Sequence, residues 1–322
     1  MPPSVPRVLI DCDPGHDDVV AIAVAAVHAD IVGITAVAGN APLHHTERNA
    51  RIALDLFGLD SVPVHSGAER PLVAAARDAS HVHGKTGLDG PPPRQPSRPP
   101  DSRDAISFLI EQIRADEGLW LVPTGPLTNV ALAFRAAPDL PRRLAGVSLM
   151  GGSANHGNVT ATAEYNVWAD PEAAAAVFAH GHETTIRMCG LNLTHQVRAD
   201  PAFVDRIRAS PGDAAQFSAS LIHHYRTYHA SLLGDPAAGC PLHDPCAVLA
   251  VTHPELFVFE RRQVSVECAG THTRGMTVVD GRGYDNAALR NVDVAMTIDG
   301  PAALAIIEAA LTRRAVVAAA DL

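Results

Sequence analysis

The chain alternates short apolar runs with helical segments, and this alternation restricts its fold more than any other feature of the sequence. Residues 8–10 are apolar, 17–28 have helical spacing with acidic residues in the first turn, 31–38 are rich in β-branched side chains, and 46–57 are again helical before Gly58. This order predicts a mostly parallel sheet with right-handed crossovers. We therefore expect an open, Rossmann-like α/β sheet flanked by helices.

The alternation resumes near residue 104. Further strands are expected at 62–64, 119–122, 147–150 and 184–188, and helices at 104–115, 128–135, 171–179, 201–233, from 244 onwards and at 301–314. Three β-rich runs between 262 and 298 give the C-terminal part an additional helical and β-rich character. Two stretches interrupt the pattern, namely the proline-rich loop 78–101 and the turn and loop at 269–286. Because neither resembles an interdomain linker, residues 1–322 are expected to form a single domain.

Charge and composition exclude several classes of function. The net charge is −10 and Lys85 is the only lysine, whereas a nucleic-acid-binding protein needs clustered cations. The N-terminus lacks the apolar segment of a signal peptide, and no window approaches the roughly 18 apolar residues of a membrane span. The five cysteines show no Cys-x-x-Cys pair. We expect a cytoplasmic protein that binds a small molecule and contacts neither nucleic acid nor membrane.

Four aspartates lie within eight residues directly after the first apolar run, in Asp11-Cys-Asp-Pro-Gly-His-Asp-Asp18. In open parallel sheets ligands bind at the carboxyl ends of strands, where this cluster falls. Carboxylates this close raise one another's pKa unless a cation is present, and oxygen ligands without histidine or cysteine spacing favour Ca²⁺ or Mg²⁺. An EF-hand is excluded, because the positions that need glycine and glutamate hold His16 and Ile22.

Three alternatives fit the cluster taken alone. It could be a solvated acidic turn that begins a helix. It could belong to a phosphatase in which Asp11 attacks phosphorus and Asp13 supplies a proton, although such a site needs a cation for the phosphoryl group and only Lys85 or an arginine could provide one. It could also belong to a calcium-stabilised protein that binds a nucleoside or sugar without catalysis.

The aspartate cluster resembles the opening motif of the inosine/uridine-preferring nucleoside hydrolase family. Further segments resemble that family in the same order, at 37–40, 81–84, 121–129, 149–152, 163–172, 190–195, 243–246 and 275–277. They extend from residue 8 to about residue 280, nearly the whole chain. The resemblance implies calcium-dependent hydrolysis of the N-glycosidic bond of ribonucleosides, which yields ribose and a free nucleobase, by a homodimer or homotetramer.

The resemblance also implies a role for individual residues. The Ca²⁺ ligands are the carboxylates of Asp13, Asp18 and Asp244 and the backbone carbonyl of Thr124. Asp13 also activates the attacking water, and His243 protonates the leaving base. The substrate is bound by Asp17, Asn40, Met150, Asn158, Glu164 and Asn166 around the ribose, and by His81, Tyr225 and Tyr228 near the base.

Structural roles would also explain some of these residues individually. Asp244 before Pro245 could be a helix N-cap, Asn40 a turn residue, and Tyr225 and Tyr228 could belong to the core or to a helix face. Within the motifs, Asp11 is expected to support the loop through hydrogen bonds, and His16 to be a surface residue. Asn192, which replaces an aspartate of many relatives, is expected to alter only a neighbouring contact. The sequence predicts no preference for one nucleobase.

Overall fold

The computed structural model describes residues 5–101, 104–282 and 287–313, and its centre is an eight-stranded sheet. The strand order is β3-β2-β1-β4-β5-β6-β12-β9. The strands are β1 (Arg7–Cys12), β2 (Asp30–Ala36), β3 (Val64–Ser66), β4 (Trp120–Pro123), β5 (Gly146–Met150), β6 (Ile186–Cys189), β9 (Phe257–Arg262) and β12 (Val292–Ile298). All neighbours pair in parallel except β9, which is antiparallel to β12. The predicted Rossmann-like α/β fold is therefore confirmed.

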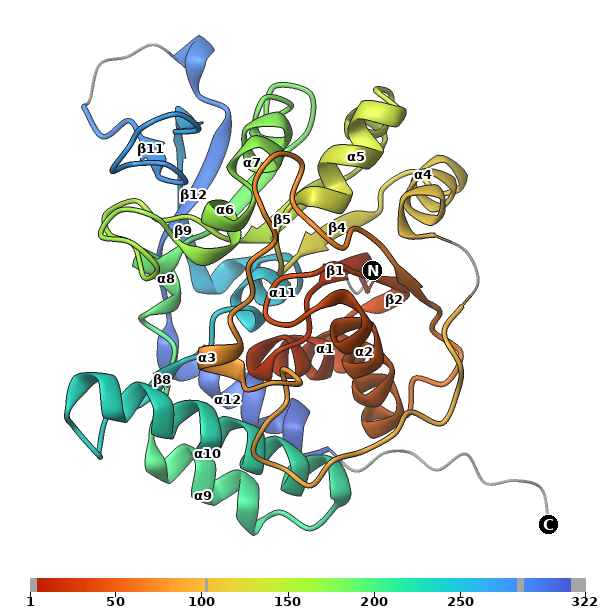
Figure 1. Cartoon of the computed structure of the whole chain (residues 1–322), viewed down its shortest axis with the longest axis vertical. Coiled ribbons are helices and arrows are strands. Elements are labelled where there is room, and N and C mark those ends of the chain that lie inside the picture. The colour runs from red at the N-terminus through yellow and green to blue at the C-terminus, as the bar shows by residue number, and fades with distance from the viewer. Residues whose placement is uncertain (1–4, 102–103, 283–286, 314–322) are drawn as a thin grey trace.

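Helices cover both faces of the sheet (Figure 1). One face carries α1 (His16–His28), α2 (Leu43–Phe57), α11 (Pro245–Thr252) and α12 (Gly300–Thr312), with α9 (Pro201–Ala209) and α10 (Asp213–Leu233) packed outside them. The other face carries α4 (Ala105–Ala115), α5 (Thr128–Ala136) and α7 (Pro171–Phe178). Each face has its own apolar core.

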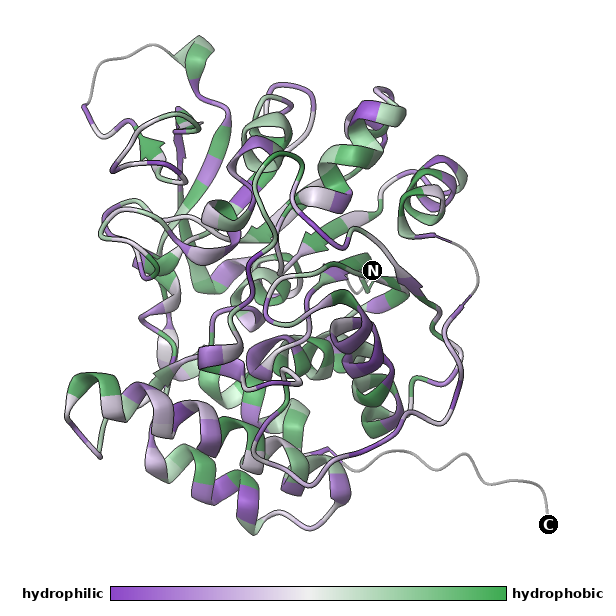
Figure 2. Ribbon diagram, viewed as in Figure 1, coloured by the Kyte–Doolittle hydropathy of each residue, from purple (hydrophilic) through white to green (hydrophobic). Residues whose placement is uncertain are grey.

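The sequence of β1 shows why both faces must be covered. Val8 and Ile10 belong to the core beneath α1, whereas Leu9 belongs to the core beneath α4 and α5. Successive side chains of a strand point to opposite faces, so a continuous apolar run needs a helical layer on each side. The central strands are correspondingly hydrophobic along their length, and α2 turns a hydrophilic side outward (Figure 2).

Several expected boundaries follow from local chemistry. Gly58 ends α2 in the left-handed conformation, with φ of 69°. Asp170 accepts a hydrogen bond from the Ala173 amide at the start of α7, and Pro171 occupies the first helical position. The strand expected at 62–64 pairs instead from Val64 to Ser66.

The segment 201–233, expected to be helical, is helical except for one break. The segment is divided into α9 and α10 at Ser210-Pro211-Gly212. Proline cannot donate a helical hydrogen bond and disfavours helical geometry at the preceding residue, and Gly212 has φ of 128°.

Short elements complete the described part of the chain. The loop 78–101 contains a four-residue helix, α3 (Ser80–His83). The others are α6 (Tyr165–Ala169), α8 (Leu191–Thr194), β7 (Arg198–Ala199), β8 (Cys240–Pro241), β10 (Val264–Val266), β11 (Thr277–Val279) and the 3₁₀ turns Leu140–Arg143, Pro254–Leu256 and Ala287–Leu289. Of the expected turn and loop at 269–286, residues 283–286 lie outside the described residues, as does residue 314 of the expected last helix. Among the helices of the described ranges, none is long and apolar enough to cross a membrane.

The strand order reverses at β1. From β1 the chain adds β2 and β3 on one side and then β4, β5 and β6 on the other. The loops that leave β1 and β4 therefore diverge, and a crevice opens at the carboxyl ends of these strands. The loop after β1 carries Asp13, the first turn of α1 carries Asp17 and Asp18, and the loop after β4 begins with Thr124.

Candidate active site

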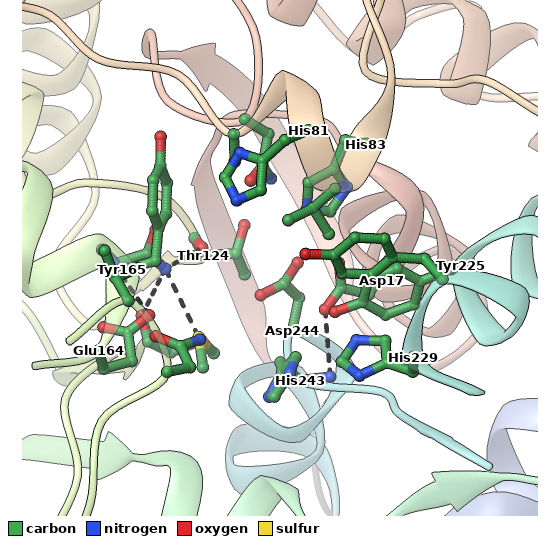
Figure 3. A pocket seen from close by; sticks show the side chains of 18 of the residues that line it. Asp17, His81, His83, Thr124, Glu164, Tyr165, Tyr225, His229, His243 and Asp244 are labelled. Atoms are coloured by element: carbon green, nitrogen blue, oxygen red, sulfur yellow. Dashed lines mark hydrogen bonds between the residues drawn. The ribbon is translucent and has the colours of Figure 1, made fainter. Parts of the chain in front are cut away.

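A cavity of about 240 Å³ lies at this reversal of strand order (Figure 3). Its walls come from the loops after β2, β4 and β5, from α1, α3, α6 and α10, and from the segment that precedes α11. The predicted residues that line it are Asp17, Asn40, His81, Thr124, Met150, Asn158, Glu164, Asn166, Tyr225, Tyr228, His243 and Asp244. Two predicted residues, Asp13 and Asp18, do not line the cavity and are buried.

Three carboxylates meet at the cavity. Asp17, Asp18 and Asp244 each have an oxygen within 4.8 Å of the others, and all three are buried. In Figure 3, Asp17 and Asp244 point into the same space as Thr124. Three carboxylate oxygens at this spacing can hold a metal ion. The group differs from the predicted ligand set, because it includes Asp17 and leaves out Asp13.

Asp18 is held in place by a hydroxyl, an amide and the backbone. Its Oδ1 accepts a hydrogen bond of 2.7 Å from Thr124 Oγ1. Its Oδ2 accepts bonds of 2.9 Å from the Gly15 amide and 3.1 Å from Asn40 Nδ2. The loops after β1, β2 and β4 therefore converge on one carboxylate.

Asp13 lies between two glycines and does not line the cavity. Its Oδ2 accepts a 2.7 Å hydrogen bond from the Asn40 amide, and its buried Oδ1 has no hydrogen-bond partner within the described ranges. A Cβ on Gly39 would lie 2.0 Å from Oδ2, and one on Gly125 would lie 2.6 Å from Oδ1. Only glycine at these two positions leaves room for the carboxylate.

Burial and mutual repulsion make this site favourable for a cation. Burial, reinforced by the charge of Asp18, raises the pKa of Asp17 to about 7 and that of Asp13 well above its usual range. Burial and the neighbouring aspartates likewise hold the pKa of Asp244 well above normal. A bound cation would compensate these charges and keep the carboxylates ionised.

Asp11 has the supporting role that the sequence suggested. Its Oδ1 accepts hydrogen bonds of 2.6 Å from Thr35 Oγ1 and 2.8 Å from Asn129 Nδ2. Asp11 is fully buried and does not line the cavity. These two hydrogen bonds hold the Asp11 carboxylate against β2 and α5 and not toward the cavity, which argues against the phosphatase alternative.

Polar side chains opposite the aspartates are fixed by hydrogen bonds. Asn166 Nδ2 donates to the carbonyl oxygens of Thr124 at 2.7 Å and of Met150 at 3.1 Å. Glu164 accepts from the amides of Gly152 and Asn166, both at 2.8 Å. Burial nevertheless raises the pKa of Glu164 to about 7. The wall of the cavity is therefore polar and rigid, as sugar hydroxyls require.

Aromatic rings form the wall of the cavity that faces Glu164 and Asn166. Tyr225 is buried and its ring stacks 5.5 Å from those of His16 and His83, centre to centre. The expectation that His16 is a surface residue is wrong. Its side chain is 1% exposed, and its Nε2 lies 2.8 Å from the carbonyl oxygen of Asp89, so it ties the loop 78–101 to α1.

His243 lies beside the carboxylates. Its amide donates a 3.2 Å hydrogen bond to Asp17 Oδ2, and its ring Nδ1 lies 2.7 Å from Thr194 Oγ1. Burial, followed by the nearby His195 and His229, holds the pKa of the His243 imidazole well below its usual value. Asp244 forms no side-chain cap of α11, which removes the simplest structural explanation for it.

Sequence reasoning missed the contribution of His229. It lines the cavity, its ring meets that of Tyr225 edge-on at 4.6 Å, and its buried Nε2 has no hydrogen-bond partner in the described part of the chain. Helical spacing from Tyr225 was the available signal, because residues four apart lie on one face of a helix.

Asn192 accepts a hydrogen bond from the Ala154 amide and donates one to the Ala295 carbonyl, and an ionised aspartate could not make both bonds.

Comparisons with known proteins agree with this geometry. Residues 8–305 match the inosine-uridine preferring nucleoside hydrolase family. The chain is 42% identical to the pyrimidine-specific ribonucleoside hydrolase RihA of Shewanella baltica over 280 residues, which cover 85% of this chain and 86% of the relative. It is also 42% identical to the RihA of Photobacterium profundum over 279 residues, 85% of this chain and 88% of that protein.

Solved structures give the same result. A plant nucleoside hydrolase superposes with a TM-score of 0.88 at 29% identity, over 96% of this chain and 99% of its own. A purine-preferring ribonucleoside hydrolase from Gardnerella vaginalis superposes with a TM-score of 0.88, also at 29% identity, over 95% and 98% of the two chains. The chain belongs to the inosine-uridine preferring nucleoside hydrolase family and is a nucleoside hydrolase that acts on ribonucleosides.

Proposed function

We propose that this enzyme is calcium-dependent and that Asp13, Asp18, Asp244 and the Thr124 carbonyl hold the Ca²⁺. The group formed by Asp17, Asp18 and Asp244 carries the proposal, because three buried carboxylate oxygens within 4.8 Å of one another can hold a cation. Asp13 Oδ1 has no hydrogen-bond partner among the described residues, so it is available as a ligand. The Thr124 carbonyl accepts one bond from Asn166 and keeps a second lone pair.

The donor set favours Ca²⁺ over other metals. It consists of oxygens from carboxylates and a carbonyl, which are ligands of Ca²⁺ and Mg²⁺ rather than of zinc or copper. Ca²⁺ accepts about six to eight oxygens, which leaves positions for the substrate. When bound, the ion supplies positive charge that keeps the aspartates ionised and polarises neighbouring oxygen atoms.

We assign the general base to Asp13 and the leaving-group donor to His243. Asp13 takes a proton from water, and the oxygen of that water forms a bond to C1′ of the ribose. The C1′–N bond breaks with its electron pair going to the nucleobase, which ends by taking one proton, so water and nucleoside yield ribose and free base. The transition state has oxocarbenium character, as in other glycoside hydrolysis. His243 lines the cavity and can donate to the base as negative charge develops on it.

Asp17, Asn40, Asn158, Glu164 and Asn166 are assigned to the ribose. All five line the cavity, and several are already oriented by hydrogen bonds to the chain. A site built to bind hydroxyls leaves polar groups unpaired when a hydroxyl is missing. We expect 2′-deoxyribonucleosides to be much poorer substrates than ribonucleosides.

We propose pyrimidine ribonucleosides as the preferred substrates. Relatives named pyrimidine-specific are 42% identical, whereas the purine-preferring structure is 29% identical. His81, Tyr225, Tyr228 and His229 line the cavity and would surround the base. Aromatic faces stack on any base, so hydrogen bonds from the histidines would supply the selectivity.

The cellular setting belongs to the same proposal. The five cysteines are free thiols, four of them buried, which suits a reducing cytoplasmic compartment. The resemblance to nucleoside hydrolases supports a homodimer or homotetramer, which light scattering of the purified enzyme measures directly.

A panel of nucleosides tests the proposal. Uridine, cytidine, inosine, adenosine and 2′-deoxyuridine are incubated with micromolar enzyme, and free base is quantified by chromatography. Uridine and cytidine should release base fastest and 2′-deoxyuridine slowest. Saturable binding of ribonucleosides without release of any base would instead support the alternative of a non-catalytic binding protein.

A further inference from the structure

Thr194 contacts the ring of His243 from behind the cavity. Thr194 Oγ1 lies 2.7 Å from His243 Nδ1, although the two residues are 49 positions apart. Thr194 ends the short helix α8, is fully buried and does not line the cavity. It therefore cannot touch the substrate, and any influence on the reaction must pass through His243.

The hydroxyl of Thr194 is placed to donate a hydrogen bond to the His243 ring. Its only hydrogen-bond partner within residues 5–101, 104–282 and 287–313 is the His243 ring. A hydroxyl can donate one hydrogen bond, and a buried hydroxyl whose proton meets no acceptor is unfavourable. The nitrogen Nδ1 can serve as that acceptor if it carries no proton.

The surroundings of His243 agree with an unprotonated Nδ1. The ring is buried, and a ring nitrogen that accepts a hydrogen bond carries no proton, so an imidazole that accepts the Thr194 proton at Nδ1 is neutral. A neutral imidazole carries a single N–H, at either Nδ1 or Nε2. The bond from Thr194 to Nδ1 places that proton on Nε2. The Nε2 atom makes no hydrogen bond of its own with the described residues, and His243 lines the cavity.

We propose that Thr194 is a positioning residue, whose hydroxyl donates to His243 Nδ1 and thereby fixes the tautomer that presents Nε2–H to the departing nucleobase. This inference rests on the proposed role of His243 as leaving-group donor. The opposite tautomer would direct the lone pair of Nε2 at the base while its negative charge develops, and would oppose bond cleavage. The backbone amide of His243, bonded to Asp17 Oδ2 at 3.2 Å, keeps the residue from moving as a whole.

Substrates with different leaving groups separate this role from a structural one. Uracil and cytosine are poor leaving groups that need a hydrogen-bond donor, whereas 4-nitrophenolate is a stable anion that leaves without one. For Thr194→Val, which keeps the shape and removes the hydroxyl, kcat for uridine should fall about tenfold or more. The KM for uridine and the kcat for 4-nitrophenyl β-D-ribofuranoside should both stay within about twofold, because the ribose and water sites are untouched. Thr194→Ser should restore uridine hydrolysis.

Two controls accompany these variants. Thr184→Val removes another buried threonine hydroxyl, one that has no hydrogen-bond partner in the described chain, and should change neither activity. His243→Ala tests the premise, and should lower uridine hydrolysis far more than 4-nitrophenyl riboside hydrolysis. If His243→Ala lowers both equally, the proposed role of His243 fails. If His243→Ala discriminates between the substrates but Thr194→Val lowers both equally, or lowers neither, the inference about Thr194 fails alone.

NMR of the unmodified enzyme provides a test that does not depend on folding of the variants. Long-range ¹H–¹⁵N spectra of histidine-labelled protein identify which ring nitrogen carries the proton, and the His243 signals are assigned by their absence from His243→Gln. The proton should reside on Nε2. A neutral His243 ring with its proton on Nδ1 would overturn the inference.

Discussion

The hydroxyl of Thr124 donates a 2.7 Å hydrogen bond to Oδ1 of Asp18, and this bond joins the loop that leaves β4 to the first turn of α1, the helix that follows β1. The two strands are neighbours at the point where the strand order reverses. The aspartate group is therefore assembled by the topology of the sheet, and Thr124 contributes to it through its side chain as well as through its carbonyl.

Thr124→Val should weaken Ca²⁺ binding by about 10- to 100-fold, because the substitution removes a hydrogen bond that orients a metal ligand. Calorimetric titration of chelator-treated enzyme with Ca²⁺ measures the change. Thr128→Val is the matched control, since the Thr128 hydroxyl donates a 2.7 Å bond to Asp170, which lies outside the aspartate group. Equal loss of affinity in both variants would contradict a specific role for Thr124.

Asp13→Asn should lower kcat for uridine by about 10²- to 10⁴-fold, the usual contribution of a general base, because an amide cannot take the proton of water. Asp11→Asn is the control, since Asp11 is equally buried but bonds only to Thr35 and Asn129 in the described structure. Near-normal turnover of Asp13→Asn would reject its assignment. If Asp17→Asn shows the large loss in kcat instead, Asp17 is the general base and Asp13 only helps to hold the neighbouring groups in place.

His229→Ala should raise KM for uridine about tenfold, because the base loses a hydrogen-bonding ring from the cavity wall. His223→Ala, on the exposed side of the same helix, should leave KM unchanged. Steady-state kinetics with uridine and cytidine measure both effects. An unchanged KM in His229→Ala would place the base elsewhere in the cavity.

Periodicity and motif order were sufficient to predict the parallel sheet, most helices and twelve of the nineteen residues that line the cavity. What the sequence could not supply was which groups touch. Asp17 and Asp13 stand four positions apart, yet the carboxylate of Asp17 joins Asp18 and Asp244, while that of Asp13 is not part of this group and does not line the cavity. That choice depends on Gly39 and Gly125, which approach Asp13 from two other loops.

Long-range contacts explain the other differences. His16 was expected at the surface beside the site, but the loop 78–101 folds over it and supplies His83 and the Asp89 carbonyl. The contact of Thr194 with His243 joins two motifs that sequence spacing places far apart. The break between α9 and α10, in contrast, was readable from Pro211 and Gly212.

Acid should destabilise the fold through His195. Burial, followed by the neighbours His156 and Arg198, lowers the pKa of folded His195 to about 4. The unfolded residue takes up a proton near about pH 6.5, so lowering the pH from about 7 to about 5 protonates the unfolded state and reduces the free energy of unfolding. His195→Asn removes this effect. Urea denaturation at each pH should show the stability advantage of the wild type over His195→Asn shrinking as the pH falls, and an advantage independent of pH would contradict the prediction.

The most direct measurement is uridine hydrolysis before and after removal of metal. Enzyme is treated with a chelator, exchanged into metal-free buffer and assayed for release of uracil, alone and with added Ca²⁺ or Mg²⁺. If Ca²⁺ is held by the aspartates at the carboxyl ends of β1 and β4, release stops on stripping and returns with Ca²⁺. Unchanged uracil release from enzyme shown to be metal-free, or recovery with Mg²⁺ but not with Ca²⁺, would contradict that assignment.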